Sequence, residues 1–160
     1  MTRVVLISGG NLGDARVTLL SALDMINQRV GQVVEFSTIH YSRAWGFESE
    51  QEFANQVIVV DTELDALCLL DTLQEIEAHY GRNREKENLT KKDGQRYCSR
   101  SLDIDILFYG EQVIDNERLV VPHKLMCERE FVLKPLCEIM ADYHHPFFGE
   151  SVAQLLAKVI

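Results

Sequence analysis

The sequence predicts an α+β protein with a ferredoxin-like βαββαβ core: an antiparallel sheet with helices on one face, followed by a short α/β C-terminal extension. Hydrophobic residues switch between strand and helix spacing in the order strand, helix, strand, strand, helix, strand. A glycine, Gly31 or Gly81, follows each of the two long helical segments. The 160 residues include only three prolines and no linker-like stretch, which predicts a single domain over residues 1–160.

The first half of the chain supplies three strands and one helix. β-Branched and aromatic residues predict strands at Arg3–Ser8, which ends at Gly9-Gly10, at Gln32–Ser42 and at Phe53–Thr62. The segment Asp14–Val30 is predicted to be a helix because its apolar residues recur at helical spacing. Its inward face is expected to consist of Leu19, Leu20, Leu23, Ile26 and Val30.

The second half continues the pattern after an irregular loop at 44–51. Apolar spacing predicts a helix over Asp65–Tyr80, with Leu69, Leu70, Leu73, Ile76 and Tyr80 facing inward. A fourth strand is predicted at Ser101–Tyr109. Short helices are expected around Glu128–Met140 and Val152–Lys158.

Composition excludes several classes of function. Sixteen Lys and Arg against 25 Asp and Glu give a net charge of -9, so we expect no nucleic-acid partner. No apolar run approaches the roughly 20 residues of a membrane span. The four cysteines show no pair with metal-site or redox-site spacing, which predicts reduced thiols in a cytoplasmic protein. We also expect a monomer that binds small molecules.

Two carboxylates in the fourth strand are the first candidate site. Side chains alternate along a strand, so Asp103 and Asp105 are expected on one face, with Leu102, Ile104, Ile106 and Phe108 on the other. Asp is unfavourable in strands, so two in one strand need a reason. Carboxylates at this spacing suit two magnesium ions about 3.5–4 Å apart that hold a polyphosphate, although a solvated strand face is the simpler alternative.

A basic segment leads directly into this strand. Residues 82–100 hold seven Lys and Arg against three Asp and Glu, a net charge of +4. Magnesium on one side of a triphosphate and arginines on the other would neutralise its charge. Loops of this length are often lids, so we expect Arg82–Ser99 to close over substrate, although most charge runs are solvated loops.

Further candidates lie on either side of the carboxylates. His123 could donate to a phosphate, and Asn55, unfavourable in a strand, could read a heterocycle through paired hydrogen bonds. Phe53 shares its face, and Phe131 could stack on a substrate or belong to the core. The Gly9–Gly13 segment lacks the Walker ending and dinucleotide spacing and is interpreted as a tight turn.

Taken together, these blocks resemble the 6-hydroxymethyl-7,8-dihydropterin pyrophosphokinase family of folate synthesis. The resemblance covers nearly the whole chain, in the family's order and near its spacing. It includes Gly9–Asp14, Tyr41–Gly46, Phe53–Asn55, Ile76-Glu77 and Gly81–Arg84. It is most specific at Arg100–Leu107, Val121–His123 and Arg129–Leu136.

The resemblance implies transfer of the β,γ-pyrophosphoryl group of ATP to the hydroxymethyl oxygen of the pterin, with release of AMP. It implies that Asp103 and Asp105 bind two Mg²⁺ ions and that Arg82 and Arg100 are mobile catalytic arginines. The ATP-binding positions that it implies are Gln74, Arg84, Ile106, Arg118, His123 and Arg129. The pterin-binding positions that it implies are Arg43, Ala44, Gly46, Phe53, Asn55 and Phe131.

The chain departs from the family pattern at the pterin wall and in the lid. Arg43-Ala44 stand where the family usually has Thr-Pro, and Gly10 replaces a Ser. The lid is longer than usual and carries Tyr97-Cys98-Ser99 in place of Trp-Gly-Pro. Two other functions stay open on the residues alone: another Mg²⁺-dependent nucleotide-using transferase, and a non-catalytic ferredoxin-like module that regulates or binds RNA.

Overall fold

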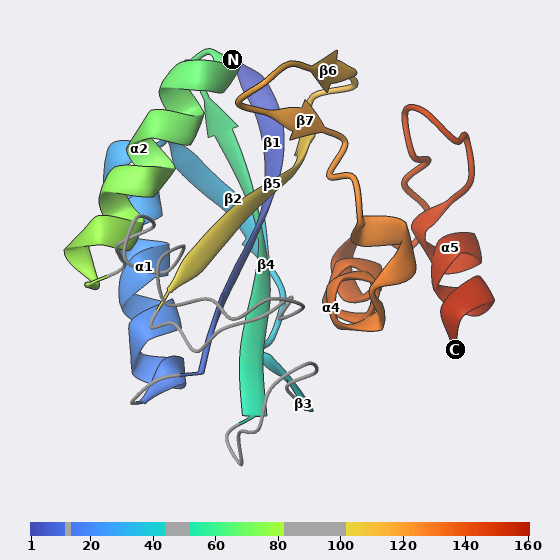
Figure 1. Ribbon diagram of the computed structural model, residues 1–160, viewed down its shortest axis with the longest axis horizontal. Helices are drawn as coiled ribbons and strands as arrows, with labels where there is room; N and C mark the ends of the chain where they lie inside the picture. The colour runs from blue at the N-terminus through green and yellow to red at the C-terminus, as the bar shows by residue number, and fades with distance from the viewer. Residues whose placement is uncertain (12–13, 44–51, 82–101) are drawn as a thin grey trace.

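A five-stranded antiparallel sheet forms the centre of the protein (Figure 1). The computed structural model describes residues 1–11, 14–43, 52–81 and 102–160. The strand order is β2-β4-β1-β5, and β3 also pairs with β4. The strands of this sheet are β1 (Thr2–Gly10), β2 (Gln32–Phe36), β3 (His40–Arg43), β4 (Glu52–Thr62) and β5 (Asp103–Tyr109).

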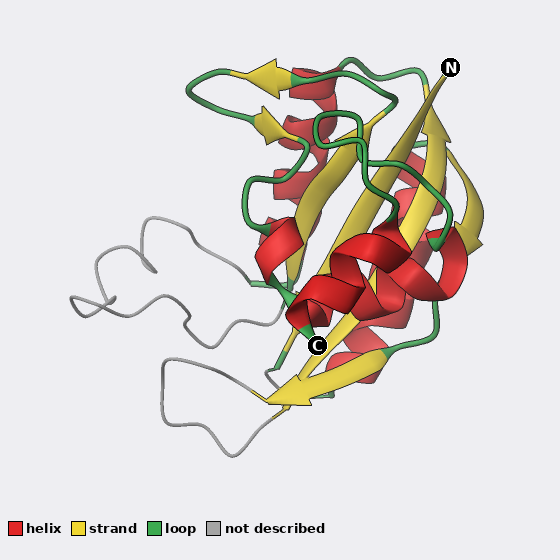
Figure 2. Cartoon of the chain, turned by 90° about the vertical axis from the view of Figure 1, so that its right-hand side faces the viewer, coloured by secondary structure: helices red, strands yellow, loops and turns green. Residues whose placement is uncertain are grey.

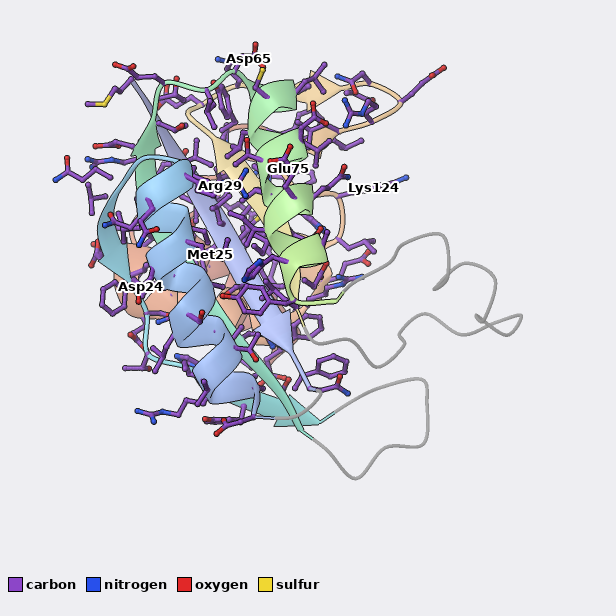
Figure 3. All side chains as sticks on the ribbon, turned by 90° about the vertical axis from the view of Figure 1, so that its left-hand side faces the viewer. Asp24, Met25, Arg29, Asp65, Glu75 and Lys124 are labelled. Carbon is purple, nitrogen blue, oxygen red and sulfur yellow. The ribbon has the colours of Figure 1, made fainter. Side chains whose placement is uncertain are left out.

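Two helices cover one face of the sheet, as the apolar spacing predicts. They are α1 (Ala15–Arg29) and α2 (Ala66–His79). Each begins at an aspartate whose side chain accepts a hydrogen bond from a backbone N–H of the first turn: Asp14 from Val17 at 3.3 Å and Asp65 from Cys68 at 2.8 Å. Arg29 of α1 forms an ion pair with Glu75 of α2 on the outside of this layer (Figure 3).

The inward faces of both helices are close to those predicted. Leu19 and Ile26 of α1 and Leu69, Leu73 and Ile76 of α2 are fully buried. They pack on a core with side chains from β1, β4 and β5. The expectation for Leu20 is wrong, because this side chain is 39% exposed. Ala22 is the buried residue of that turn. The buried face of α1 is therefore narrower than the set of apolar residues at helical spacing suggests.

The C-terminal extension covers the opposite face of the sheet (Figure 2). The predicted arrangement of helices on one face concerns the core and agrees with α1 and α2, while the helices of the extension occupy the other face. Helices α4 (Glu130–Met140) and α5 (Val152–Val159) pack against a second core of β-strand residues that includes Val5, Ile7 and Val57. The connection from β5 to α4 contains β6 (Ile114–Asp115), β7 (Val120–Val121) and a 3₁₀ turn, η1 (Met126–Glu128).

The strand predicted at Gln32–Ser42 is interrupted by a bulge. Phe36 is opposite Ile58 and His40 is opposite Asn55, so three residues of one strand face two of the other. The extra residue separates β2 from β3. At the start of the bulge, the N–H of Ser37 donates to the carbonyl of Val57 at 2.9 Å, and the Ser37 hydroxyl accepts from the N–H of Val57 at 3.0 Å.

A bulge in β5 changes which face Phe108 occupies. Leu6 is opposite Ile106 but Val5 is opposite Phe108, so Leu107 is an extra residue in β5. The prediction that Phe108 shares a face with Ile104 and Ile106 is wrong, because one extra residue reverses the alternation that follows it. Phe108 packs instead in the core under α4 and α5, with its ring centroid 5.0 Å from that of Tyr143.

Of the tight turn predicted at Gly9–Gly13, Gly9 and Gly10 belong instead to β1, and residues 12 and 13 lie outside the described part of the chain. Gly9 and Gly10 pair with Asn55 and Ala54 of β4, so the strand continues two residues beyond Ser8. In the described part of the chain, no helix combines the length and apolar character that a membrane crossing requires.

Candidate active site

Asp103 and Asp105 lie on the face of β5 that α4 and α5 cover further along the sheet. Asp105 is opposite Ile7, a residue of the core under those helices, and Asp103 is opposite Gly9. Partners directly opposite each other in an antiparallel pair project to the same face. The two carboxylates therefore share one face, as their spacing predicts, and both side chains are partly exposed.

Asn55 lies on the same face as the two aspartates because it pairs with Gly9. Gly9 pairs with Asn55 on one side and with Asp103 on the other, so the three residues form one row across the sheet. A Cβ atom added to Gly9 would lie 2.4 Å from Oδ1 of Asn55. The absence of a side chain at Gly9 therefore leaves room for the Asn55 amide between the strands, and Asn55 is only 8% exposed.

His123 is held beside the carboxylates by its own backbone and ring. Its N–H donates to the carbonyl of Leu107 at 3.0 Å, the residue that the β5 bulge removes from regular pairing with β1. Its Nδ1 accepts from the N–H of Leu125 at 3.2 Å, so Nε2 carries the proton in the neutral ring. Nε2 lies 3.8 Å from Oδ2 of Asp105, which is too long for a hydrogen bond.

Burial keeps this histidine neutral near pH 7. The pKa of His123 is lowered first by burial and then by the positive charge of Arg129, while Asp103 acts in the opposite direction. The arrangement supplies a neutral N–H donor next to two carboxylates. Such a donor can bind a phosphate oxygen.

Arg129 and Phe131 lie at the beginning of α4, and the charge of Arg129 acts on His123. Arg129 precedes the first turn of α4, and its guanidinium carbon is 5.5 Å from the ring centroid of Phe131. The ring and the cation stabilise each other's position. Both side chains are partly exposed and can contact a ligand from this position.

Two of the predicted ATP-binding positions, Gln74 and Arg118, lie at the α2 side of the molecule. Gln74 belongs to α2, and its side chain is partly exposed. Arg118 donates to Asp71 through its guanidinium, so this arginine is held at the α2 side of the molecule. The Ile106 side chain is buried in the core under α1 and α2, so only its backbone could contact a ligand.

Glu77 is a functional candidate to which the sequence reasoning assigned no role. Its side chain is 1% exposed, and Oε2 accepts the N–H of Ile104 at 2.9 Å, between the two aspartates of β5. The sequence signal that could have identified Glu77 is a carboxylate directly next to the inward-facing Ile76. Glu77 ties the end of α2 to the strand that carries the acidic pair.

Several predicted site residues lie outside the described part of the chain. These are Ala44, Gly46, Arg82, Arg84 and Arg100, together with the predicted lid. For Arg43, the structure describes its place in β3, opposite Glu52.

The donor set fits a hard cation only in part. Asp103 and Asp105 offer carboxylate oxygens, the ligands that Mg²⁺ prefers. Within residues 1–11, 14–43, 52–81 and 102–160, no cluster of three or more His, Cys, Asp or Glu side chains could hold a metal. Mg²⁺ usually keeps waters and binds through one or two carboxylates plus substrate phosphates, so an aspartate pair is compatible with such a site.

Comparison with known proteins identifies the family. The family described as 7,8-dihydro-6-hydroxymethylpterin-pyrophosphokinase matches residues 5–141, which is most of the chain. The chain belongs to this family. The match includes both aspartates of β5, Asn55, His123 and the Arg129–Phe131 segment.

Relatives of this pyrophosphokinase family are similar along most of the chain. A 2-amino-4-hydroxy-6-hydroxymethyldihydropteridine pyrophosphokinase of Methylorubrum extorquens is 38% identical over 99% of this chain and 94% of its own length. One of Haemophilus influenzae is 40% identical over 84% of this chain and 79% of its own length. A folic acid synthesis protein of Pneumocystis carinii is 34% identical over 95% of this chain, which spans only 19% of that protein.

Solved structures of the family have a similar fold. The HPPK-DHPS protein of Plasmodium falciparum, solved with SDX-DHP, aligns with 98% of this chain at a TM-score of 0.75 and 16% identity. The chain spans 44% of that protein. At this identity the likeness concerns the fold: a mixed α/β arrangement with an antiparallel sheet.

Proposed function

We propose that the protein transfers the pyrophosphoryl group of ATP to 6-hydroxymethyl-7,8-dihydropterin, with AMP as the second product, in folate biosynthesis. The observation that carries this proposal is the row formed by Asn55, Gly9 and Asp103. It brings an amide able to read a heterocycle next to carboxylates able to hold a metal–phosphate complex. Membership of the pyrophosphokinase family supports the same reaction.

Asn55 and the two phenylalanines would bind the pterin. The Asn55 amide offers donors and an acceptor, which match the paired donors and acceptors of a pterin edge. Phe53 lies two residues from Asn55 on the same strand, and Phe131 lies at the start of α4. We place the pterin between these rings and assign its remaining wall to Arg43, Ala44 and Gly46.

The acidic pair and the basic groups would bind the triphosphate. Asp103 and Asp105 would hold two Mg²⁺ ions, which would neutralise phosphate charge and lower the pKa of the attacking hydroxyl. His123 would donate from Nε2 and Arg129 from its guanidinium to phosphate oxygens. We assign ATP contacts also to Gln74, Arg84, Ile106 and Arg118, and charge stabilisation to Arg82 and Arg100. Positioning and charge would supply most of the rate, as in other phosphoryl transfers.

The proposal also includes the fold, the domain organisation, the oligomeric state and the cellular compartment. The strand order β2-β4-β1-β5, with β3 continuing along β4, supports a ferredoxin-like core extended by α4 and α5. We propose that residues 1–160 act as one domain and as a monomer. Cys68, Cys127 and Cys137 are free thiols, which supports a reducing compartment such as the cytoplasm.

The deciding experiment is to incubate the protein with ATP, Mg²⁺ and 6-hydroxymethyl-7,8-dihydropterin and to separate the nucleotides. We expect AMP in amounts equal to the pterin consumed, and none without pterin. ADP would contradict pyrophosphoryl transfer and indicate another Mg²⁺-dependent transferase. No turnover under any condition would contradict catalysis and favour a binding module.

A further inference from the structure

Glu138 joins α4 to the bulge between β2 and β3. Its carboxylate accepts three hydrogen bonds: from the N–H of Thr38 at 2.8 Å, from the Thr38 hydroxyl at 2.6 Å and from Nε2 of His40 at 2.8 Å. The pKa of Glu138 is lowered, first by the Thr38 hydroxyl, so the carboxylate is ionised near neutral pH. These contacts link residues that lie about 100 positions apart in the chain.

The bulge determines which part of the β2–β3 connection these contacts hold in place. Three residues, 37 to 39, face only Gln56 and Val57. Ser37 is held on β4 by its N–H, which donates to the Val57 carbonyl at 2.9 Å, and by its carbonyl, which accepts from Nε2 of Gln56 at 2.9 Å. The extra length of the bulge therefore lies at Thr38 and Ile39, between Ser37 and β3. The N–H of Thr38 is bonded to Glu138 rather than to β4. The carboxylate therefore holds the residues that connect Ser37 to β3, directly before the position at which His40 is opposite Asn55.

The restraint lies directly beside the pterin half of the site. His40 and Asn55 are opposite partners, and the row continues through Gly9 to Asp103. Glu138 also lies two turns after Phe131, on the same side of α4, because residues seven apart share a helix face. One carboxylate thus fixes β3 against the helix that carries the aromatic neighbour of the pterin.

We propose that Glu138 is a positioning residue for the pterin substrate, acting through Thr38 and His40 on the β3–β4 pairing. The inference rests on the proposed function only in naming the pterin as the ligand. If β3 occupies its paired position for a smaller fraction of the time, the apparent affinity for pterin falls by that fraction. Nucleotide binding, which depends on α2, β5 and His123, is expected to change little.

The test compares Glu138→Ala with Glu138→Gln and with a matched control. Asp61→Ala removes a carboxylate that accepts two hydrogen bonds from Arg3, at the other end of β4. For Glu138→Ala we expect an increase of about tenfold in the pterin dissociation constant and KM, with the ATP values unchanged. Glu138→Gln keeps one acceptor oxygen and should recover part of the affinity. Asp61→Ala should leave pterin binding at the wild-type value.

A measurement without ligands separates this inference from the proposed function. In Glu138→Ala, backbone amides of β3 and of β4 around Asn55 should exchange hydrogen faster than in the wild type, while amides of β1 and β5 do not. Wild-type exchange throughout, or a pterin affinity that Glu138→Ala does not change, would overturn the positioning role. A wild-type protein that forms no AMP would overturn the proposed function instead, and the exchange experiment would still decide the inference.

Discussion

Asn55 and Asp103 are two positions apart in one row of the sheet, with Gly9 between them. Asn55 is on β4 and Asp103 on β5, and both pair with the same residue of β1. Neighbouring strands are about 4.8 Å apart, so the two residues lie roughly 10 Å apart, measured across the strands. That spacing allows one end of a substrate to contact the amide while its other end approaches the carboxylates.

Replacing Gly9 by Ala should weaken pterin binding by about tenfold, because the new Cβ would lie 2.4 Å from Oδ1 of Asn55 and would displace the amide. Titration of the pterin in the presence of a non-hydrolysable ATP analogue measures this effect. The double variant with Asn55→Ala should bind pterin no more weakly than Asn55→Ala alone. Fully additive losses would show that Gly9 acts independently of Asn55.

Replacing Asp105 by Asn should lower the rate of AMP formation by about 10³-fold, since the substitution removes the charge of one of the two proposed metal ligands and keeps the side-chain shape. Thermal unfolding should show no loss of stability, because Asp105 is partly exposed and removing its charge relieves the repulsion from the neighbouring Asp103 carboxylate. Asp115→Asn, in the exposed β6 strand, serves as the control and should have wild-type activity. A normally active Asp105→Asn protein would refute the metal assignment.

Replacing Arg118 by Ala should raise the KM for ATP by about tenfold and leave pterin binding unchanged, because the proposed charge-assisted contact to the nucleotide would be lost. Its ion pair with Asp71 is exposed, at 49% and 56% of the two side chains, so stability should fall by less than about 1 kcal/mol. Arg29→Ala, which breaks the comparable α1–α2 pair with Glu75, is the matched control. An unchanged KM for ATP would remove Arg118 from the nucleotide site.

Acid should destabilise the protein partly through His145. This residue is 3% exposed, and its Nδ1 accepts the N–H groups of Phe147 and Phe148, each at 3.1 Å. Burial lowers the pKa of His145 below the value of about 6.5 expected in the unfolded chain. The unfolded state therefore binds more protons below that pH, so stability is complete above about pH 6.5 and is lost as pH falls.

The measurement is the midpoint of thermal unfolding between pH 8 and 5, without ligands. In His145→Asn the amide oxygen can replace Nδ1 as acceptor but cannot titrate, so the decrease in midpoint below pH 6.5 should be smaller than in the wild type. His123, whose pKa is also lowered, should retain its own part of the decrease. His144→Asn, at an exposed neighbouring position, should follow the wild type. Identical curves for His145→Asn and wild type would contradict the assignment.

Local patterns predicted most of the elements because those elements depend on neighbours in the chain. The extents and apolar faces of α1 and α2 and the strands β1, β4 and β5 follow from residue spacing within a few positions. The errors occur where a distant partner intervenes. Thr38 bonds to Glu138 rather than continuing a strand, and the extra residue at Leu107 moves Phe108 to the other face.

The residues of the candidate site also fall into two groups: those that local patterns predict, and those whose role depends on a distant partner. The aspartate pair and its shared face follow from alternation along one strand, and the family resemblance identified Asn55, His123 and Phe131. Neither Glu77 nor Glu138 received a role, because a carboxylate on a helix gives no sign of which backbone N–H or side chain it meets. Their partners, Ile104 and Thr38, belong to other elements.

The sequence by itself determined the family, the order of helices and strands and the residue types that can bind a phosphate, a metal and a heterocycle. Only the tertiary structure decided which of these residues are neighbours. The row from His40 through Asn55 and Gly9 to Asp103 requires four strands to pair in one register. Register depends on burying the correct face of each strand under helices from distant parts of the chain, and local propensity carries no information about it.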